Sequence, residues 1–394
     1  MNTTESSLLN STVACLENCT TTINIIDDKT TAIANHIVIV VLNYVNYVLL
    51  PVFLVLGLTG NTLTIMVMNN KKFVNQTSTL FLTALSLSDT VLLLTQPFNK
   101  VFVMKLFGLD LRALSNIGCK IFFIIFKTSK MTSSWFLVLL CFERFVAVWF
   151  PLKAKTICTR RYAFIAIAAV YLVIGSYTSI WSYASNIDEK GICHPDQYDK
   201  SDPVEVQKFG RFIIGGVSLY SLIPTTILLT LTPLIVVQLF RRAKMFGKMS
   251  SQSKKKQSDT NKTTVMLVGV MFAYVILILP VTGLHLFAFI FRLNAFGSGS
   301  LGWAIYREVS QILEQINYCI NFFLYVLSSS LFRGALNDLL CFKKLRTLKR
   351  STHLGSSIRR NNSEKIKTNL TGTESNEKTI ENEGPAKEDD GQKF

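Results

Sequence analysis

Charged side chains inside apolar stretches are the residues of this sequence that could do chemistry. Glu143 and Arg144 are adjacent, and apolar runs at 135–140 and 145–150 flank them on both sides. The charges in other apolar stretches include Asp89, Lys130 and Glu314. A charge in such surroundings is costly unless an opposite charge compensates it, and it usually marks function. The chemistry that these residues predict is the formation and exchange of ion pairs.

The sequence contains no comparable sign of enzymatic catalysis. The sequence contains only four His and shows no His/Cys metal-ligand spacing, no nucleophile motif and no Gly-rich phosphate loop. We therefore expect that the protein is not an enzyme.

Composition places the chain in a membrane. Its 394 residues are 49% hydrophobic and only 17% charged, with a mean hydropathy of +0.35, whereas soluble proteins average roughly a quarter charged residues. The net charge of +16 comes from basic residues in short loops beside apolar spans. That pattern sets membrane orientation, so nucleic acid is not an expected partner.

Spans of about 20 apolar residues cross the hydrocarbon core of a bilayer. The sequence predicts seven of them, at about 44–68, 77–98, 113–149, 162–184, 212–240, 264–291 and 301–327. We therefore expect an all-α membrane protein, a seven-transmembrane helix bundle. No internal repeat of the kind found in many transporters is evident.

Orientation follows from Lys and Arg, which concentrate in one set of connections and in the segment after the last span. By the positive-inside rule that set is cytoplasmic, which places the N-terminus outside the cell and the C-terminus inside. The expected location is the plasma membrane. Glycosylation sequons in the N-terminal tail agree with this orientation: Asn2, Asn10 and Asn18.

The chain divides into four expected parts: an extracellular glycosylated tail (1–40), the seven-helix domain (41–328), an amphipathic helix on the membrane surface (329–342) and a disordered cytoplasmic tail (343–394). Within the surface helix, Cys341 is a candidate for palmitoylation, with a free thiol as the alternative. The polar, basic segment 245–259 shows no apolar periodicity. We expect a loop there that faces anionic lipid or binds a partner.

The third span connects two features. Cys119 and Arg144 are 25 positions apart, which is roughly 37 Å of helix, a little more than the hydrocarbon core. Cys119 therefore lies at the outer interface and the Glu143–Arg144 pair at the inner one. Cys119 and Cys193 both face an oxidising compartment and are able to form a disulfide; inert buried thiols are the alternative.

These features resemble the rhodopsin-like (class A) G-protein-coupled receptors over about residues 40–342. The resemblance rests on one motif for each helix, in order: Gly60-Asn61; Leu85-Ser-Leu-Ser-Asp89; Cys119 with Glu143-Arg144-Phe145; Pro224; Pro280; and Asn321-Phe-Phe-Leu-Tyr325 followed by Phe332-Arg333. The seventh span has Phe322 where the family usually has Pro. In this form it resembles invertebrate neuropeptide receptors of the FMRFamide-receptor-like and thyrotropin-releasing-hormone-receptor-like groups. The resemblance implies a neuropeptide receptor that acts through outward movement of the sixth helix.

The family assigns roles to matching positions. Glu143 would hold Arg144 in the inactive state, and Arg144 would meet the G protein after activation. The resemblance adds four residues to this coupling machinery: Phe145, Pro280, Asn321 and Tyr325. It also implies a sodium and water site, with Asp89 as the metal-binding carboxylate, made of Asp89, Ser133, Asn317 and Asn321. A protonated Asp89, hydrogen-bonded to Asn61 or Asn321, is the alternative; no cofactor other than this allosteric sodium ion is expected.

Three departures from the family pattern bear on mechanism. The fourth span lacks a central Trp, and Tyr171 is the nearest large aromatic residue there. Ile278 stands where the sixth span usually has Trp, and Thr232 replaces the Tyr of the fifth span. Pro280 lacks a backbone N–H and is still able to kink the sixth helix.

The ligand site is expected in the outward cavity, where Phe126 takes the place of the Asp that amine receptors need. The candidate contacts are Lys100, Phe126, Lys127, Lys130, Glu308, Gln311, Glu314 and Gln315. Lys130 and Glu314 have two interpretations, a structural ion pair or ligand contacts that stay locked together until a ligand separates them. The acidic outer loop favours a cationic peptide by electrostatic steering.

The expected partners are an extracellular peptide, a heterotrimeric G protein, membrane lipids and arrestin, the last through phosphorylated Ser and Thr of the tail. A seven-span transporter or channel is the main alternative function. A receptor for a lipid or a small organic ligand is the other.

Overall fold

The computed structural model of the chain describes residues 33, 35–38, 40–42, 44–45, 47–74, 76–99, 102–195, 201–245, 251–290 and 300–340. The chain divides into two units, Met1–Asn337 and Asp338–Phe394, and the features below belong to the first. Several predicted features lie outside the described residues. These are the glycosylation sites Asn2, Asn10 and Asn18, the pocket candidate Lys100, the palmitoylation candidate Cys341 and the tail 343–394.

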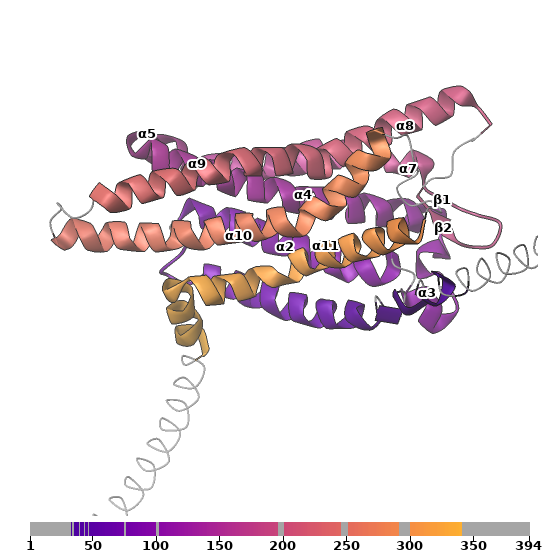
Figure 1. The fold of residues 1–394 in the computed structure, drawn as a ribbon, viewed down its shortest axis with the longest axis horizontal. Helices are drawn as coiled ribbons and strands as arrows, with labels where there is room; N and C mark the ends of the chain where they lie inside the picture. Colours follow the sequence, from indigo (N-terminus) through magenta and orange to yellow (C-terminus); the bar gives the residue numbers. More distant parts are fainter. Residues whose placement is uncertain are drawn as a thin grey trace, which may run out of the picture. The chain divides into compact units, whose positions relative to one another are not determined.

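Helices account for nearly all of the described chain (Figure 1). A first helix, Asn35–Met68, precedes α2 (Thr77–Asn99), α3 (Phe102–Phe107) and a 3-10 turn at Leu111–Leu114. The middle of the chain forms α4 (Asn116–Trp149), α5 (Pro151–Ile157), α6 (Arg160–Thr178), α7 (Trp181–Ala184) and the antiparallel strands β1 (Asn186–Ile187) and β2 (Cys193–His194). The remainder forms α8 (Pro203–Val217), a π-helical turn (Ser218–Leu222), α9 (Ile223–Met245), α10 (Ser251–Ile290) and α11 (Leu301–Ser328).

Six helical segments are long and apolar enough to cross a membrane by length and composition, among them α2, α4 and the continuous stretch Pro203–Arg242 that α8 and α9 form. Within the described residues, the count of such segments rises from six to seven when α11 is taken together with the helix Ser330–Leu340, which follows it at a bend of 100°. α11 carries three charged residues, Arg307, Glu308 and Glu314. The predicted bundle is thus confirmed.

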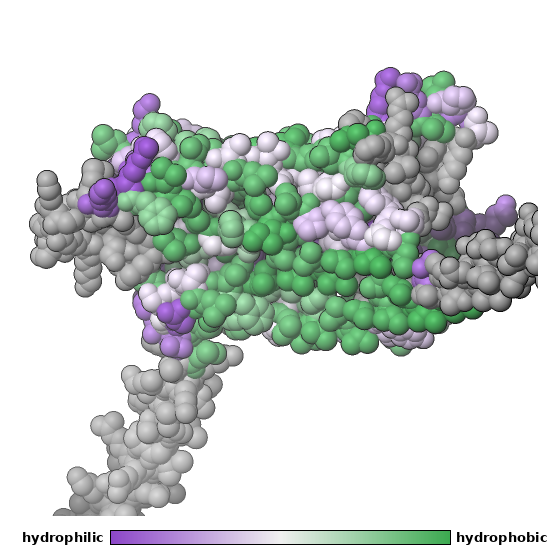
Figure 2. Space-filling view, viewed as in Figure 1, coloured by the Kyte–Doolittle hydropathy of each residue, from purple (hydrophilic) through white to green (hydrophobic). Residues whose placement is uncertain are grey.

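The surface has the distribution that a bilayer requires. Figure 2 shows apolar side chains over the middle of the helices on the face in view, with hydrophilic residues gathered toward the two ends. Large hydrophobic side chains such as Leu172, Phe164 and Phe272 are exposed. In water such a surface would drive aggregation, whereas lipid solvates it.

The core lies between α2, α4, α9, α10 and α11, where Leu85, Leu137, Leu228, Met271 and Tyr325 belong to one buried cluster. The first helix packs closely on α11 through glycine. A Cβ added to Gly60 would lie 2.9 Å from the Cβ of Phe322, so any larger residue at position 60 would push these helices apart. Phe322, the departure from the family pattern, therefore fills the space beside Gly60.

Tyr171 connects three helices. Its hydroxyl lies 3.0 Å from Ser88 Oγ on α2, and Ser88 in turn lies 3.0 Å from Thr132 Oγ1 on α4. The Tyr171 ring packs edge-on against Phe136 with a centroid distance of 5.3 Å. A tyrosine thus links α6 to α2 and α4 in a span without a central tryptophan.

The helix boundaries differ from the predicted spans at three places. The segment 245–259 was expected to be a loop, but it is helical from Ser251, because Lys and Gln are good helix formers and extend the apolar span. The fifth span begins at Pro203 rather than near 212, since the side chain of Asp202 caps the helix and Pro203 suits its first turn. The fourth span breaks after Thr178 and resumes at Trp181.

Candidate functional site

The bundle has two ends, which we call the hairpin end, where β1 and β2 lie, and the Arg144 end, where α4 meets α5. At the Arg144 end, Arg144 Nε donates to Glu143 Oε2 at 2.7 Å, and an Nη donates to Oε1 at 2.6 Å. Both side chains are buried. Bidentate contact between a guanidinium and a carboxylate is the strong form of this pair, so each charge compensates the other where the apolar spans end.

Arg144 has a second partner that the sequence did not indicate. The same guanidinium group donates to Ser78 Oγ at 2.5 Å, and Ser78 is buried in the first turn of α2. This contact holds the end of α4 against the start of α2. Phe145, next in the chain, packs on Trp149, with a centroid distance of 5.9 Å.

Asp89 lies on α2 with no exposed surface and is held from two helices. Ser133 Oγ of α4 donates to its Oδ1 at 2.5 Å, and Asn321 Nδ2 of α11 donates to its Oδ2 at 2.9 Å. Asn61 instead donates to the Tyr318 carbonyl, at 3.2 Å, so of the two amide partners considered for Asp89 only Asn321 reaches it. Asn317 is buried on the same helix as Asn321.

Tyr325 lies on α11, four residues after Asn321, and Pro280 lies on α10. The Tyr325 side chain is completely buried, its ring is 5.5 Å from that of Phe332, and its hydroxyl has no hydrogen-bond partner among the described residues. α10 contains Pro280 and changes direction along its length (Figure 1). Tyr306 of α11 donates to the Pro280 carbonyl at 2.7 Å.

Toward the hairpin end, Lys130 and Glu314 form an ion pair between α4 and α11. Lys130 Nζ lies 2.6 Å from Glu314 Oε1, and the side chains are 20% and 8% exposed. The hydroxyls of Tyr220 and Tyr318 donate to the same carboxylate oxygen, Tyr318 at 3.0 Å. Lys130 Nζ also lies 4.4 Å from the centre of the Tyr220 ring. Three segments, α4, the π-helical turn and α11, therefore meet at one carboxylate.

The π-helical turn has a second contact with α4. Trp135 Nε1 donates to the Leu219 carbonyl at 2.9 Å. The wider turn spaces its backbone groups so that a carbonyl is free for a partner outside the helix, and the same turn positions Tyr220 toward Glu314.

The other predicted pocket residues are distributed along the same half of the bundle. Lys127 lies one turn of α4 before Lys130 and over the ring of Trp181, with Nζ 4.4 Å from the ring centre. Phe126 is buried and stacks on Phe122. Glu308 pairs with its neighbour Arg307 at 3.2 Å. Gln315 is buried and Gln311 is partly buried.

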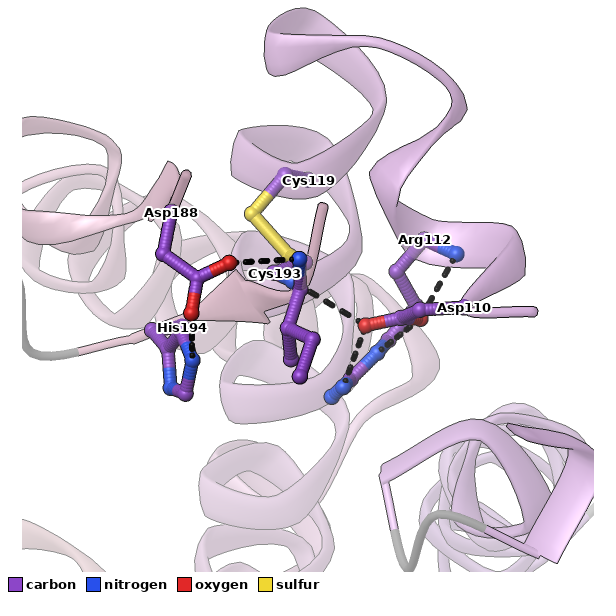
Figure 3. A network of polar contacts seen from close by, with 7 residues as sticks. Asp110, Arg112, Cys119, Asp188, Cys193 and His194 are labelled. Carbon is purple, nitrogen blue, oxygen red and sulfur yellow. Dashed lines mark hydrogen bonds and ion pairs between the residues drawn. A yellow bond between two sulfur atoms is a disulfide. The ribbon is translucent and has the colours of Figure 1, made fainter. Parts of the chain in front are cut away.

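A disulfide joins Cys119 at the start of α4 to Cys193 on β2, with the two Cα atoms 5.7 Å apart (Figure 3). Beside it, Asp110 accepts hydrogen bonds from the Arg112 side chain at 2.8 Å and from the Cys193 backbone N–H at 3.0 Å. Burial opposes ionisation of Asp110, but these bonds outweigh it and hold its pKa below the usual range. The hairpin is therefore fixed to α4 by a covalent bond and to the 3-10 turn before α4 by a buried charge.

Asp188 organises the turn between the strands. It accepts from the Ile192 backbone N–H at 2.7 Å and from the Lys190 N–H at 3.0 Å, and its other oxygen lies 3.0 Å from His194 Nε2. The bond from Ile192 is the chief reason why the pKa of Asp188 is lowered.

The sequence reasoning missed Ser78, Tyr220 and Tyr318. Nothing in the sequence marks Ser78 except its position. It is the second residue of a span that begins at the same membrane depth as Arg144. Tyr318 could have been found, because it lies four residues after Glu314 and so on the same helical face. Tyr220 could not, because its direction depends on the π-helical turn.

Comparisons with known proteins agree with these features. A family model described as 7 transmembrane receptor (rhodopsin family) matches residues 60–325. Growth hormone secretagogue receptor type 1 of Sus scrofa is 26% identical over 312 residues, which cover 75% of this chain and 81% of that receptor. Galanin receptor type 1 of Homo sapiens is 24% identical over 306 residues, which cover 74% of this chain and 80% of that receptor.

Proposed function

The chain belongs to the rhodopsin family of seven-transmembrane receptors, and we propose that its ligand is an extracellular peptide whose binding is transmitted to a heterotrimeric G protein. It is accordingly a multi-pass membrane receptor and not an enzyme. Membership of this family does not favour the transporter or channel that was the main alternative.

The observation that carries the coupling proposal is the contact of Arg144 with Glu143 and Ser78 at the end of α4. A buried guanidinium that is fully paired is stable only while its partners stay in place. If α10 moves outward about the bend at Pro280, this end of the bundle opens and Arg144 becomes available to a partner helix. The Glu143–Arg144–Ser78 contact then acts as the restraint on the resting state.

A peptide ligand is favoured by the relatives named for galanin and for growth hormone secretagogues. The ion pair of Lys130 and Glu314 would be the point at which the ligand acts on the bundle, because it joins α4 to α11 toward the hairpin end. The finer resemblance to FMRFamide and thyrotropin-releasing-hormone receptors stays a prediction, as does a lipid or small organic ligand as the alternative.

Asp89 is the residue that we assign to an allosteric sodium ion. Its carboxylate and the Ser133 hydroxyl, with the amide oxygens of Asn317 and Asn321, would supply the oxygen ligands that a hard cation prefers. Bound there, the ion would compensate the charge of Asp89. The extracellular N-terminus, the cytoplasmic C-terminus, arrestin and lipid contacts belong to the same proposal.

The test is a peptide-library screen on cells that express the receptor with a promiscuous G protein and a calcium readout. The expected result is a response that Arg144→Ala abolishes at equal surface expression, with Lys153→Ala, an exposed basic residue on α5, as the matched control. A ligand-gated current that persists without G proteins would overturn the coupling proposal in favour of a channel.

A further inference from the structure

Among the described residues, the cluster around the Glu314 carboxylate holds one more cation than it holds anions. Lys127 and Lys130 lie three residues apart on α4 and so on the same face. Glu314 is the carboxylate beside them, and Lys130, Tyr220 and Tyr318 already share its Oε1. Within the described part of the chain, no carboxylate lies within ion-pair distance of Lys127.

Lys127 contacts an aromatic ring instead. Its Nζ lies 4.4 Å from the centre of the Trp181 ring and 5.9 Å from that of Phe126. A cation over a ring gains less than a cation beside a carboxylate, so the charge of Lys127 is compensated only in part.

Trp181 brings an independent observation to the same place. The residue is 7% exposed, and its indole N–H has no hydrogen-bond partner among the residues that the structure describes. Buried indole N–H groups usually find an acceptor. An ammonium group and an unpaired N–H are thus donors side by side, and an acceptor is what both lack.

Four other carboxylates among the described residues are already engaged. Asp110 is bound by Arg112, Asp188 by His194 and Glu308 by Arg307, and Glu205 accepts from the Tyr183 hydroxyl at 3.1 Å. Each of these carboxylates would have to abandon its partner to reach Lys127. The acceptor is therefore better supplied by a ligand.

We propose that Lys127 and Trp181 form a subsite for an anionic group of the ligand, a carboxylate that a peptide carries as its free C-terminus or as an Asp or Glu side chain. This inference rests on the proposed receptor function. It reverses the expectation of a cationic ligand, because Glu314 already accepts from Lys130, Tyr220 and Tyr318, while no carboxylate among the described residues lies within ion-pair distance of Lys127. A neutral carbonyl would fill the hydrogen bonds but leave the excess positive charge, whereas a carboxylate satisfies both.

The first test needs no agonist. Thermal unfolding of the purified full-length receptor is followed with N-acetyl-phenylalanine, which has a carboxylate, and with N-acetyl-phenylalanine amide, which is its neutral match. At about 10 mM, a fragment with a Kd of about 1 mM occupies most of the receptor and raises its unfolding temperature. The acid is expected to give the larger shift.

Variants locate the effect. Lys127→Met should abolish the difference between acid and amide, and Trp181→Phe, which keeps the ring and loses the N–H, should reduce it. Lys120→Met removes a charge from the same helix nearer its start and should leave the difference intact. Equal shifts, no shift, or a difference that persists in Lys127→Met would each overturn the subsite; Lys127→Gln, which also removes the charge, serves if the Met variant does not fold.

The second test identifies the source of the carboxylate and uses active peptides from the library screen. Each is made with a free or an amidated C-terminus, and with Asp or Glu replaced by Asn or Gln. One of these two changes is expected to lower potency by about tenfold or more in the wild type but not in Lys127→Met. The carboxylate that binds is then the one that this change removes. If the acid and amide fragments give different shifts but no peptide produces a signal, the subsite is upheld and the peptide receptor is refuted. If peptides signal but neither amidation nor replacement of Asp and Glu changes their potency, the peptide receptor is upheld and the subsite is refuted.

Discussion

Lys130 Nζ lies 2.6 Å from Glu314 Oε1 and so ties α4 to α11 at the point where the Tyr220 and Tyr318 hydroxyls converge on the same oxygen. This contact is common to both interpretations open from the sequence, a structural ion pair and a pair that stays locked until a ligand separates it. The same two helices also contact Asp89 of α2. Asn321 and Ser133, which hold Asp89, lie on these two helices.

Breaking this ion pair should destabilise the receptor. Glu314→Gln leaves Lys130 partly buried without its counter-charge, which we expect to lower the free energy of unfolding by about 3 kcal/mol. The double variant Lys130→Met with Glu314→Gln removes both charges and keeps an acceptor for the two tyrosines. It should lose less than Glu314→Gln alone, as measured by thermal unfolding in a double-mutant cycle. Additive losses would show that the two charges do not interact.

The contact of Arg144 with Ser78 should restrain basal signalling. A hydrogen bond to a charged group contributes about 1.5 kcal/mol, so Ser78→Ala should shift the equilibrium toward the active state by about tenfold. The measurement is G-protein activation without ligand, normalised to surface expression. Ser78→Thr keeps the hydroxyl and should stay close to the wild type. Basal activity that is the same in all three receptors would rule out a restraining role for Ser78.

Most of the fold follows from the sequence because apolar length is a strong signal. α2 and α4 lie where the apolar runs place them, and the spacing from Cys119 to Arg144 predicts the two ends of α4 correctly. The limits of α8 and α10 did not follow, because Asp202 and the polar residues after Ser251 extend helices beyond their apolar parts. Hydropathy does not record capping or helix propensity.

The residues of the site could be predicted where a charged side chain stands in an apolar stretch, because such a charge is costly there. Glu143, Arg144, Asp89, Lys130 and Glu314 stand out for that reason, and in the structure each has a partner. The partners that are neutral hydroxyls were harder to find. Ser78, Tyr220 and Tyr318 are ordinary residues for a membrane helix, and only the packing of separate helices gives them a role.

The Asp110 carboxylate should make the hairpin end sensitive to acid. Because its pKa is lowered in the folded receptor, its stabilisation is complete above the usual aspartate pKa of about 4 and is lost as the pH falls below that value through the lowered pKa. Asp110→Asn should lower the free energy of unfolding by about 2 kcal/mol at neutral pH. The difference in unfolding temperature from the wild type should shrink toward pH 3 or so. A difference that is constant with pH would mean that the charge of Asp110 contributes nothing.

The Tyr325 hydroxyl should matter for activation rather than for the resting receptor. It is buried without a hydrogen-bond partner among the described residues, an arrangement that costs about 1–3 kcal/mol. Tyr325→Phe keeps the ring that packs on Phe332 and removes this cost, so thermal stability without ligand should be unchanged or higher. The response to agonist should fall, since a hydroxyl that is unsatisfied at rest finds its partner only after the helices move. Tyr318→Phe is the matched control, because its hydroxyl already donates to Glu314 and its loss should lower stability. If Tyr325→Phe lowered stability as Tyr318→Phe does, the hydroxyl would have a partner in the resting state and the assignment to activation would fail.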